Sequence, residues 1–228
     1  MSTLSFTGNF GSNASSSAGT TLAVTVTVNV GDVVIVCCAT VGTAIQAPTD
    51  NASGGSNPYF AITPLITNTN SVQLWMCVNA KAATTVTMNN TSSRRSCCVA
   101  TYRGSSVTGT GASTTGSGTA LSLATTQRNS DSWIVTGFAH EGTGTFGTPN
   151  TGNLRVSIAG SGSTTPGSAI MDNTGAGGAS ITCSTTNSAS TAWTGVSAEL
   201  QTFSAGLDMV PGRDGLPRGH WSWEIEGY

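Results

Sequence analysis

Helical periodicity is almost absent from this chain, and short runs of β-branched, aromatic and other apolar residues recur between clusters of Gly, Ser, Asn and Pro. In residues 22–28, Leu22, Val24, Val26 and Val28 alternate mainly with Thr, which is typical of a half-buried antiparallel strand. Residues 33–38 are apolar without interruption and predict a strand that is covered on both faces. The chain is therefore expected to be all-β.

Strands are predicted at residues 22–29, 33–40, 59–66, 72–79, 84–88, 97–103, 121–125, 133–140, 154–159, 179–184 and 192–203. Several short strands at such intervals favour an antiparallel β-sandwich of jelly-roll-like type. At 228 residues, the chain has room for one large β-domain, which we place at residues 1–205.

A weak internal repeat supports a sandwich built from two related halves, at about residues 20–104 and 119–203. An offset of 99 residues superimposes Leu22, Asp32 and Ile35 on Leu121, Asp131 and Ile134. At a larger offset, residues 47–51 resemble residues 169–173, so Asp50 and Asp172 are predicted to cap equivalent turns. The Gly/Ser/Thr-rich residues 104–118 are predicted to form a surface crossover loop between the halves.

The low charge of the chain limits its partners. Charged residues make up 8% of the sequence, against roughly 25% in an average soluble domain, and the formal net charge is -2. Nucleic-acid binding needs a basic patch, and the adjacent pair Arg94 and Arg95 is better interpreted as a solvated strand end. No run approaches the roughly 18 apolar residues of a membrane helix. A neutral, hydroxyl-rich surface permits packing against copies of the same chain.

The six cysteines are predicted to be free, buried thiols. Residues 1–6 show no signal-peptide pattern, so folding is expected in the cytoplasm, where disulfides are rare. Cys37–Cys38 and Cys97–Cys98 are adjacent within strand-like runs, so their side chains point to opposite faces and one of each pair is expected in the core. A disulfide and a metal site are the alternatives, although no zinc-type spacing occurs.

Sequence motifs for catalysis are absent. The chain has two histidines, and His140, next to Glu141, is predicted to lie in a solvated loop. No Gly-x-Ser-x-Gly or His-Glu-x-x-His motif occurs, and we expect no enzyme activity, cofactor or metal, with calcium at Asp50 and Asp172 as the alternative. Trp75, Trp133 and Trp193 lie in predicted strands and are interpreted as core residues rather than a sugar-binding platform.

Residues 206–228 differ from the rest of the chain and are predicted to form an extended C-terminal arm. They hold six of the 18 charged residues, two of the five Trp and all of the net charge. Residues 220–228 alternate apolar and other side chains, which suits a strand added to a sheet edge. The arm could pack on its own sandwich, reach a neighbouring subunit or stay unstructured. Its candidate partner-binding residues are Arg213, Leu216, Trp221, Trp223, Ile225 and Tyr228.

Residues 30–36, 49–54, 72–80 and 99–104 together resemble jelly-roll-type β-sandwich domains of tailed-phage virion proteins and of some bacterial surface proteins. The resemblance implies a virion structural protein, most concretely a capsid decoration (cement) protein made in the host cytoplasm. Its partners would be copies of itself and a major capsid or other virion protein. A glycan-binding or tail/fibre module, with a glycan as ligand, and an extracellular filament subunit are the alternatives.

Overall fold

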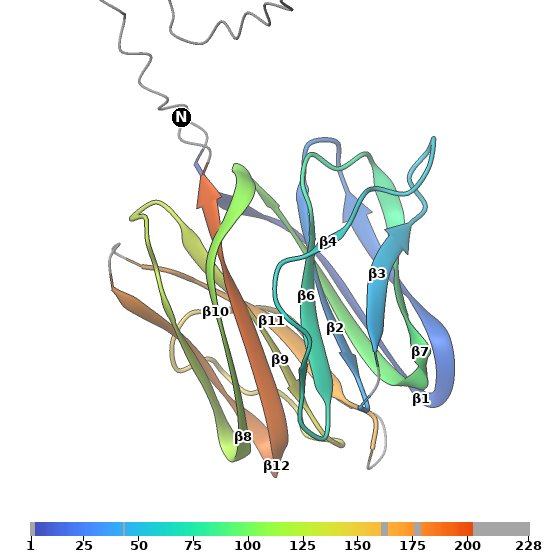
Figure 1. The fold of residues 1–228 in the computed structure, drawn as a ribbon, viewed down its shortest axis with the longest axis vertical. Coiled ribbons are helices and arrows are strands. Elements are labelled where there is room, and N and C mark those ends of the chain that lie inside the picture. Colours follow the sequence, from blue (N-terminus) through green and yellow to red (C-terminus); the bar gives the residue numbers. More distant parts are fainter. Residues whose placement is uncertain (1–2, 43, 161–163, 176–178, 203–228) are drawn as a thin grey trace, which may run out of the picture.

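The computed structural model describes residues 3–42, 44–160, 164–175 and 179–202, and their regular structure consists entirely of β-strands (Figure 1). The prediction of an all-β, antiparallel sandwich is confirmed. The strands are β1 (Ser5–Val28), β2 (Val33–Thr40), β3 (Ile45–Asp50), β4 (Phe60–Ala61), β5 (Ile66–Thr67), β6 (Ser71–Cys77), β7 (Ala83–Arg103), β8 (Ser105–Thr126), β9 (Trp133–His140), β10 (Asn153–Ile158), β11 (Gly167–Thr174) and β12 (Ser180–Thr202).

The strands form two sheets with the same internal order. The first sheet runs β1-β7-β2-β6, and the second runs β8-β12-β9-β11. β4 and β5 pair with the outer side of β6, as β10 does with β11. β3 pairs with the first part of β7, and isolated bridges at Phe146 and Thr151 attach the corresponding segment to β12. Each sheet therefore belongs to one half of the chain, and both halves share one connectivity.

In each half, the two longest strands pair with one another and form a ribbon that folds back over itself. Residues 5–15 of β1 pair with the end of β7, whereas residues 21–28 pair with its beginning. Gly11 then lies against Val24 and Thr25, so closely that a Cβ at Gly11 would overlap the Thr25 carbonyl oxygen. β8 and β12 repeat this arrangement, with Thr125 Oγ1 2.5 Å from Ser197 Oγ. Doubling such a ribbon gives the two-layered connectivity of a jelly roll in each half.

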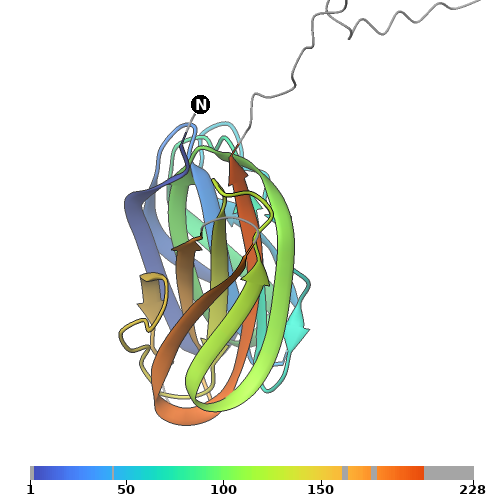
Figure 2. The same cartoon turned by 90° about the vertical axis from the view of Figure 1, so that its left-hand side faces the viewer.

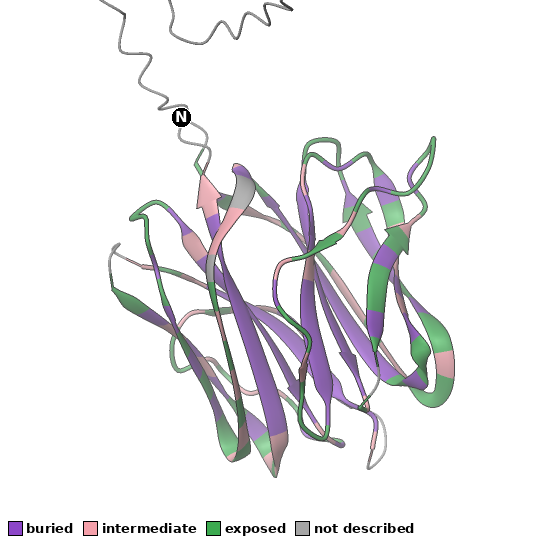
Figure 3. Ribbon diagram, in the orientation of Figure 1, coloured by how far each residue is buried: buried purple, intermediate pink, exposed green. Residues whose placement is uncertain are grey.

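Three apolar clusters hold the layers together, and the inner strands that carry them are buried along most of their length (Figure 3). The largest lies between the halves and joins Ile35 and Leu74 to Val135 and Ile170. The other two lie inside the individual jelly rolls, beneath the folded-over parts of β1 and β8. Because burying one such side chain contributes about 1.5–3 kcal/mol, the shared cluster binds the halves into one body.

The link between the halves is a single residue. Gly104 separates β7 from β8, has a φ of +86°, and would clash with the Thr3 carbonyl carbon at 2.8 Å if it carried a Cβ. Only glycine meets both conditions without strain. The segment expected to be a crossover loop is instead the first part of β8, so that prediction is wrong.

The ribbon of β1 and β7 and the ribbon of β8 and β12 each bend where they fold over, and different residues fill the two bends. In the first half, the buried Arg95 guanidinium donates hydrogen bonds to the carbonyl oxygens of Thr21, Ser17 and Ser93. In the second half, Trp193 takes the corresponding place beside Gly116. The interpretation of Arg95 as a solvated residue is therefore wrong, whereas Arg94 is exposed as expected.

Most predicted strands are present, with changed limits. β2 and β9 have the predicted limits, and the separate predictions 84–88 and 97–103 merge in β7. Residues 59–66 contain only the two-residue β4 and the start of β5, and β3 and β11 were not predicted. β3 is an edge strand with three exposed and three polar residues among its six, so it contains no apolar run that a sequence search could find.

The structure corrects the register of the repeat. Buried positions of β1 and β8 correspond at an offset of 99, but the turn that follows is one residue longer in the second half. Buried Asp32 therefore corresponds to buried Ser132 and not to exposed Asp131. Asp50 does cap its turn, accepting hydrogen bonds from the N–H groups of Ala52 and Asn57. Asp172 lies instead inside β11, so the predicted equivalence with Asp50 is wrong.

All six cysteines are free and buried, which confirms the prediction of structural thiols. Both members of each adjacent pair are in a core, because β2 and β7 form a middle layer: Cys37 faces the other half and Cys38 faces the folded-over ribbon. The expectation that only one of each pair is buried was wrong. Burial raises the pKa of Cys77 and Cys183 to about 11, which makes these thiols unreactive at neutral pH.

Candidate functional site

The six predicted partner-binding residues, Arg213, Leu216, Trp221, Trp223, Ile225 and Tyr228, lie outside the described residues. What the structure does establish is where their segment is attached. β12 ends at Thr202, which pairs with Ser105 at the same end of the molecule as the β1–β2 and β8–β9 turns (Figure 1). We call this the exit end, and it is the candidate functional site.

Charged side chains are concentrated at the exit end. The first 202 residues contain six basic and six acidic residues, and only Arg94, Arg95 and Glu141 lie at the opposite end. The other nine are Asp32, Asp50, Lys81, Arg103, Arg128, Asp131, Arg155, Asp172 and Glu199. The opposite end therefore presents mainly Ser, Thr, Gly and Asn, with Arg94 as an exposed charge.

Glu199 organises the turn beside Thr202. Its side chain is fully buried, and its Oε1 accepts hydrogen bonds from the N–H groups of Arg128 (2.8 Å) and Asn129 (3.1 Å) and from the Ser132 hydroxyl (2.5 Å). The turn is closed by the Ser132 N–H, which donates to the Asn129 carbonyl oxygen at 3.1 Å. A buried carboxylate thus fixes the conformation of the exposed loop above it.

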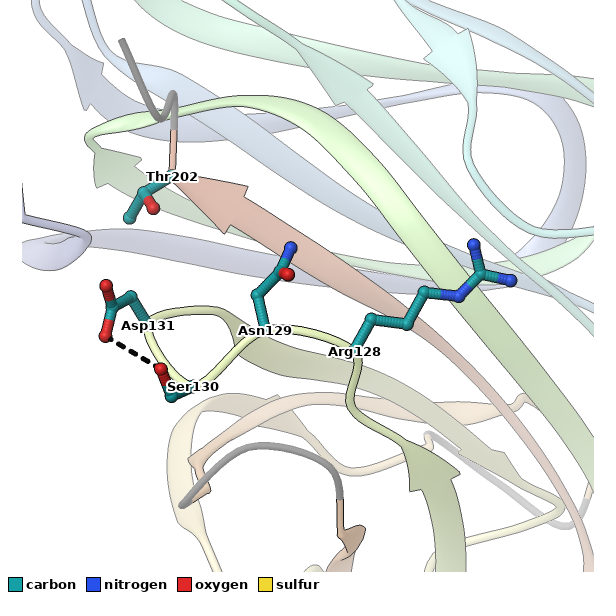
Figure 4. A pocket seen from close by; sticks show the side chains of 5 residues that line it. All are labelled: Arg128, Asn129, Ser130, Asp131 and Thr202. Carbon is teal, nitrogen blue, oxygen red and sulfur yellow. Dashed lines mark hydrogen bonds between the residues drawn. The ribbon is translucent and has the colours of Figure 1, made fainter. Parts of the chain in front are cut away.

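This loop and Thr202 line a polar hollow of about 360 Å³ (Figure 4). Its lining residues are Arg128, Asn129, Ser130, Asp131 and Thr202. Within it, Ser130 Oγ donates to Asp131 Oδ1 at 3.3 Å. The hollow therefore offers one cation, one anion and several hydrogen-bonding groups beside Thr202.

Acid should weaken the exit end through Glu199. Burial alone raises the pKa of this carboxyl, but the hydrogen bonds from Ser132, Asn129 and Arg128 outweigh it and hold the pKa below its ordinary value. A group with a lowered pKa stabilises the fold above its unfolded-state value and loses that contribution as pH falls through the folded-state value. We expect Glu199→Gln to cost about 1–3 kcal/mol at neutral pH and to flatten the decline of stability toward pH ~3.

Urea unfolding of the two proteins at several pH values measures this difference. Glu141→Gln, at the opposite end, is the matched control for the loss of one carboxylate outside this turn. Equal slopes for the native chain and Glu199→Gln would show that the carboxylate does not carry the acid sensitivity.

A second ionic network at the exit end joins the two halves. Asp172 of β11 is fully buried, and its Oδ2 accepts hydrogen bonds from the Arg155 guanidinium (2.5 Å) and from the Tyr102 hydroxyl (3.1 Å). Its Oδ1 accepts a hydrogen bond from the Asn153 amide at 3.1 Å. Because Tyr102 belongs to the first half and the other residues belong to the second, this network connects the jelly rolls through hydrogen bonds.

Aromatic rings enclose the same network. The Arg155 guanidinium carbon lies 4.6 Å from the centre of the Phe6 ring and 5.8 Å from that of Trp133. Tyr102 packs edge-on against Trp133, and Phe10, which is exposed, stacks on Phe6. A cation between ring faces is stabilised by the ring quadrupoles, so Arg155 is held from both halves.

The other sequence candidates have structural roles. Trp193 is buried, and Trp75 and Trp133 are half-buried and pack against apolar clusters, so they form no flat sugar-binding platform. His140 is fully buried, its ring packs on Phe146, and burial lowers its pKa; the prediction of a solvated histidine is wrong. Among the described residues, no cluster of three or more His, Cys, Asp or Glu side chains could hold a metal ion.

Sequence reasoning missed Glu199, Asp172 and Arg155 as organising residues. The sequence contains one indication of such residues, a charged residue within an apolar strand, as in residues 154–156 and 196–200. A charge buried in this way needs a hydrogen-bonding or ionic partner. The partners themselves are far apart in the chain and could not be assigned.

The described part of the chain contains no helix long and apolar enough to cross a membrane. No protein-family model matches the chain, and neither the curated proteins nor the solved structures contain a significant match to it.

Proposed function

We propose that the protein is a structural subunit of a virion, most concretely a capsid decoration protein that stabilises a shell through subunit contacts. The observation that carries this proposal is the attachment of residues 203–228 to the exit end of an interlocked double jelly roll. A rigid body with a terminal segment rooted beside a fixed polar turn suits a subunit that is held in place by that segment.

Two further features support an assembly role. The halves share a continuous core and the Tyr102–Asp172 hydrogen bond, so the body resists bending when a neighbour contacts it. The sandwich itself carries equal numbers of basic and acidic residues, and several of them are paired internally. Copies can therefore approach one another without long-range repulsion.

In this proposal, the segment 206–228 provides the contact with the shell or with a neighbouring subunit. Its Trp221 and Trp223 would act as aromatic anchors, since buried Trp side chains dominate the energetics of many interfaces. Arg213 and the acidic residues of the segment would set its register by charge.

Deleting residues 206–228 should abolish association with the particle and leave the double jelly roll folded. The measurement is co-sedimentation of the purified protein with particles from the source, with circular dichroism as the test of folding. Arg94→Ala, an exposed change at the opposite end, is the matched control and should associate normally. Full association of the truncated protein would overturn the role of the segment, and glycan binding lost on Trp221→Ala would favour the glycan-binding alternative.

A further inference from the structure

β8 leaves one side of its backbone without a partner strand. It is the last strand of the second sheet and pairs with β12 along one side (Figure 2). Among the described residues, no strand pairs with its other side. Outward-pointing N–H and C=O groups on such an edge form a template for an added strand.

The free edge lacks the usual protective features. Residues 111–118 contain no charged residue and no proline, which are the common means of preventing strand addition. Its counterpart β1 is covered: it packs beside β10, and Ser12 Oγ donates to the Ser157 carbonyl oxygen at 3.4 Å. In the repeated connectivity, the strands that would cover β8 as β10 covers β1 are β4 and β5. These strands have two residues each, so the long edge of β8 stays uncovered.

One face of β8 continues the face of β12 that packs against the first half. Ser113 and Thr115 lie opposite Val196 and Thr194 of β12, whose side chains face the first half. The Thr194 hydroxyl donates to the Asn70 carbonyl oxygen at 3.3 Å, so the first half reaches β12. Ser113 and Thr115 nevertheless remain exposed, because the first half does not extend as far as β8.

Apolar side chains stand exposed beside this uncovered strip. Phe60 is 43% exposed and Leu65 is 36% exposed, and both lie in the β4–β5 segment. β5 packs against β12, the neighbour of β8. A strand added to β8 with apolar residues on one face would place them toward Phe60 and Leu65.

Residues 220–228 have the sequence that this edge requires. Trp221, Trp223 and Ile225 alternate with Ser222 and other polar residues, so a strand would present one apolar face and one polar face. We propose that residues 111–118 of β8 accept residues 220–228 of a second copy as an added antiparallel strand. This inference rests on the proposed function and names the partner as another copy of the same chain.

The position of Thr202 favours a second copy over the same chain. β12 ends beside Ser105, where β8 begins, and its direction there leads away from residues 111–118 (Figure 1). To add in antiparallel orientation to its own β8, the segment from residue 203 would have to run back about 43 Å along the sheet and then reverse. The 17 residues 203–219 span at most about 60 Å when extended, which would leave about five of them for that reversal, whereas addition to a second copy needs none.

Charge substitutions on the edge test the contact in the full-length chain. Thr115→Glu should weaken self-association about tenfold or more, because Thr115 lies on the face toward which Trp221, Trp223 and Ile225 would point, and a carboxylate among these side chains would lose its hydration. Thr115→Val, which adds an apolar side chain of the same shape to that face, should retain it. Ser122→Glu is the matched control, since Ser122 is exposed on the same strand but outside residues 111–118. Light scattering over a range of protein concentrations gives the dissociation constants.

Disulfide trapping identifies the occupant. All six native cysteines are buried, so Ser113→Cys in one preparation and Gly227→Cys in another introduce thiols on the face that Trp221, Trp223 and Ile225 would share. Mild oxidation of the mixture should yield a mixed disulfide dimer in excess of either homodimer. A mixture without mixed dimers, together with an internal disulfide in the double variant, would overturn the proposal in favour of addition to the same chain.

The outcomes separate this inference from the proposed function. Self-association and particle binding that are unaffected by Thr115→Glu would refute the β8 edge but leave the structural role intact. A chain that stays monomeric at all concentrations and does not bind particles would refute both.

Discussion

Replacing Asp172 with Ala should lower the free energy of unfolding by about 3–5 kcal/mol, the usual cost of breaking a buried ion pair on one side. The change leaves the Arg155 guanidinium, whose side chain is only 21% exposed, without its carboxylate partner. It also leaves the Tyr102 hydroxyl unpaired in the core between the halves. Because Tyr102 belongs to the other jelly roll, the loss should weaken the junction between the halves as well as the second half itself.

Urea-induced unfolding, followed by tryptophan fluorescence, measures the effect. Asp131→Ala is the matched control: this carboxylate is exposed at the same end and should cost less than about 0.5 kcal/mol. Asp172→Asn keeps a hydrogen-bond acceptor without the charge and should fall between the two. A loss for Asp172→Ala as small as that for Asp131→Ala would show that the network does not stabilise the fold.

Gly137→Val should destabilise the protein by about 3 kcal/mol, at the upper end of the cost of overpacking a core. Gly137 lies on β9 at the contact between the halves, and a Cβ there would be 2.8 Å from Cys37 Sγ and 2.9 Å from Leu74 Cδ2. Both neighbours belong to the first half and are fully buried, so neither has free space to move into. The two sheets would have to separate locally to admit the side chain.

A double-mutant cycle tests whether the clash lies between the halves. Leu74→Ala alone should cost about 2–5 kcal/mol through the cavity it leaves. Combined with Gly137→Val, it removes the obstructing side chain, so the double variant should be more stable than the sum of the single effects implies. Additive losses would place the strain elsewhere.

The sequence predicts the inner strands well because both faces of these strands are buried. β2 and β9 are continuous apolar runs with turn residues on either side, and periodicity alone is enough to find them. Residues 105–120 of β8 were misread for the opposite reason. Their many glycines suggest a loop, yet Gly109 and Gly116 are required because larger residues would meet Glu199 and Trp193.

The contacts between side chains at the exit end could not be predicted from the sequence. Tyr102 and Asp172 are 70 residues apart, as are Asn129 and Glu199, and each contact depends on how two sheets or two distant strand ends meet. The repeat was visible in residues 22–36, but the turn insertion before Ser132 shifts the register by one and misassigns Asp131. The predicted partner-binding residues lie outside the described part of the chain, so their role stays a prediction.

The single-residue link at Gly104 has a mechanical consequence. Two domains joined by a flexible linker rotate about it and dissipate a load as motion, but here the end of β7 passes directly into β8. A force applied to one jelly roll must therefore deform the shared apolar core before it can move the other. Under mechanical load, the two halves should therefore behave as one rigid body. They should unfold in a single cooperative step, without an intermediate in which the halves separate.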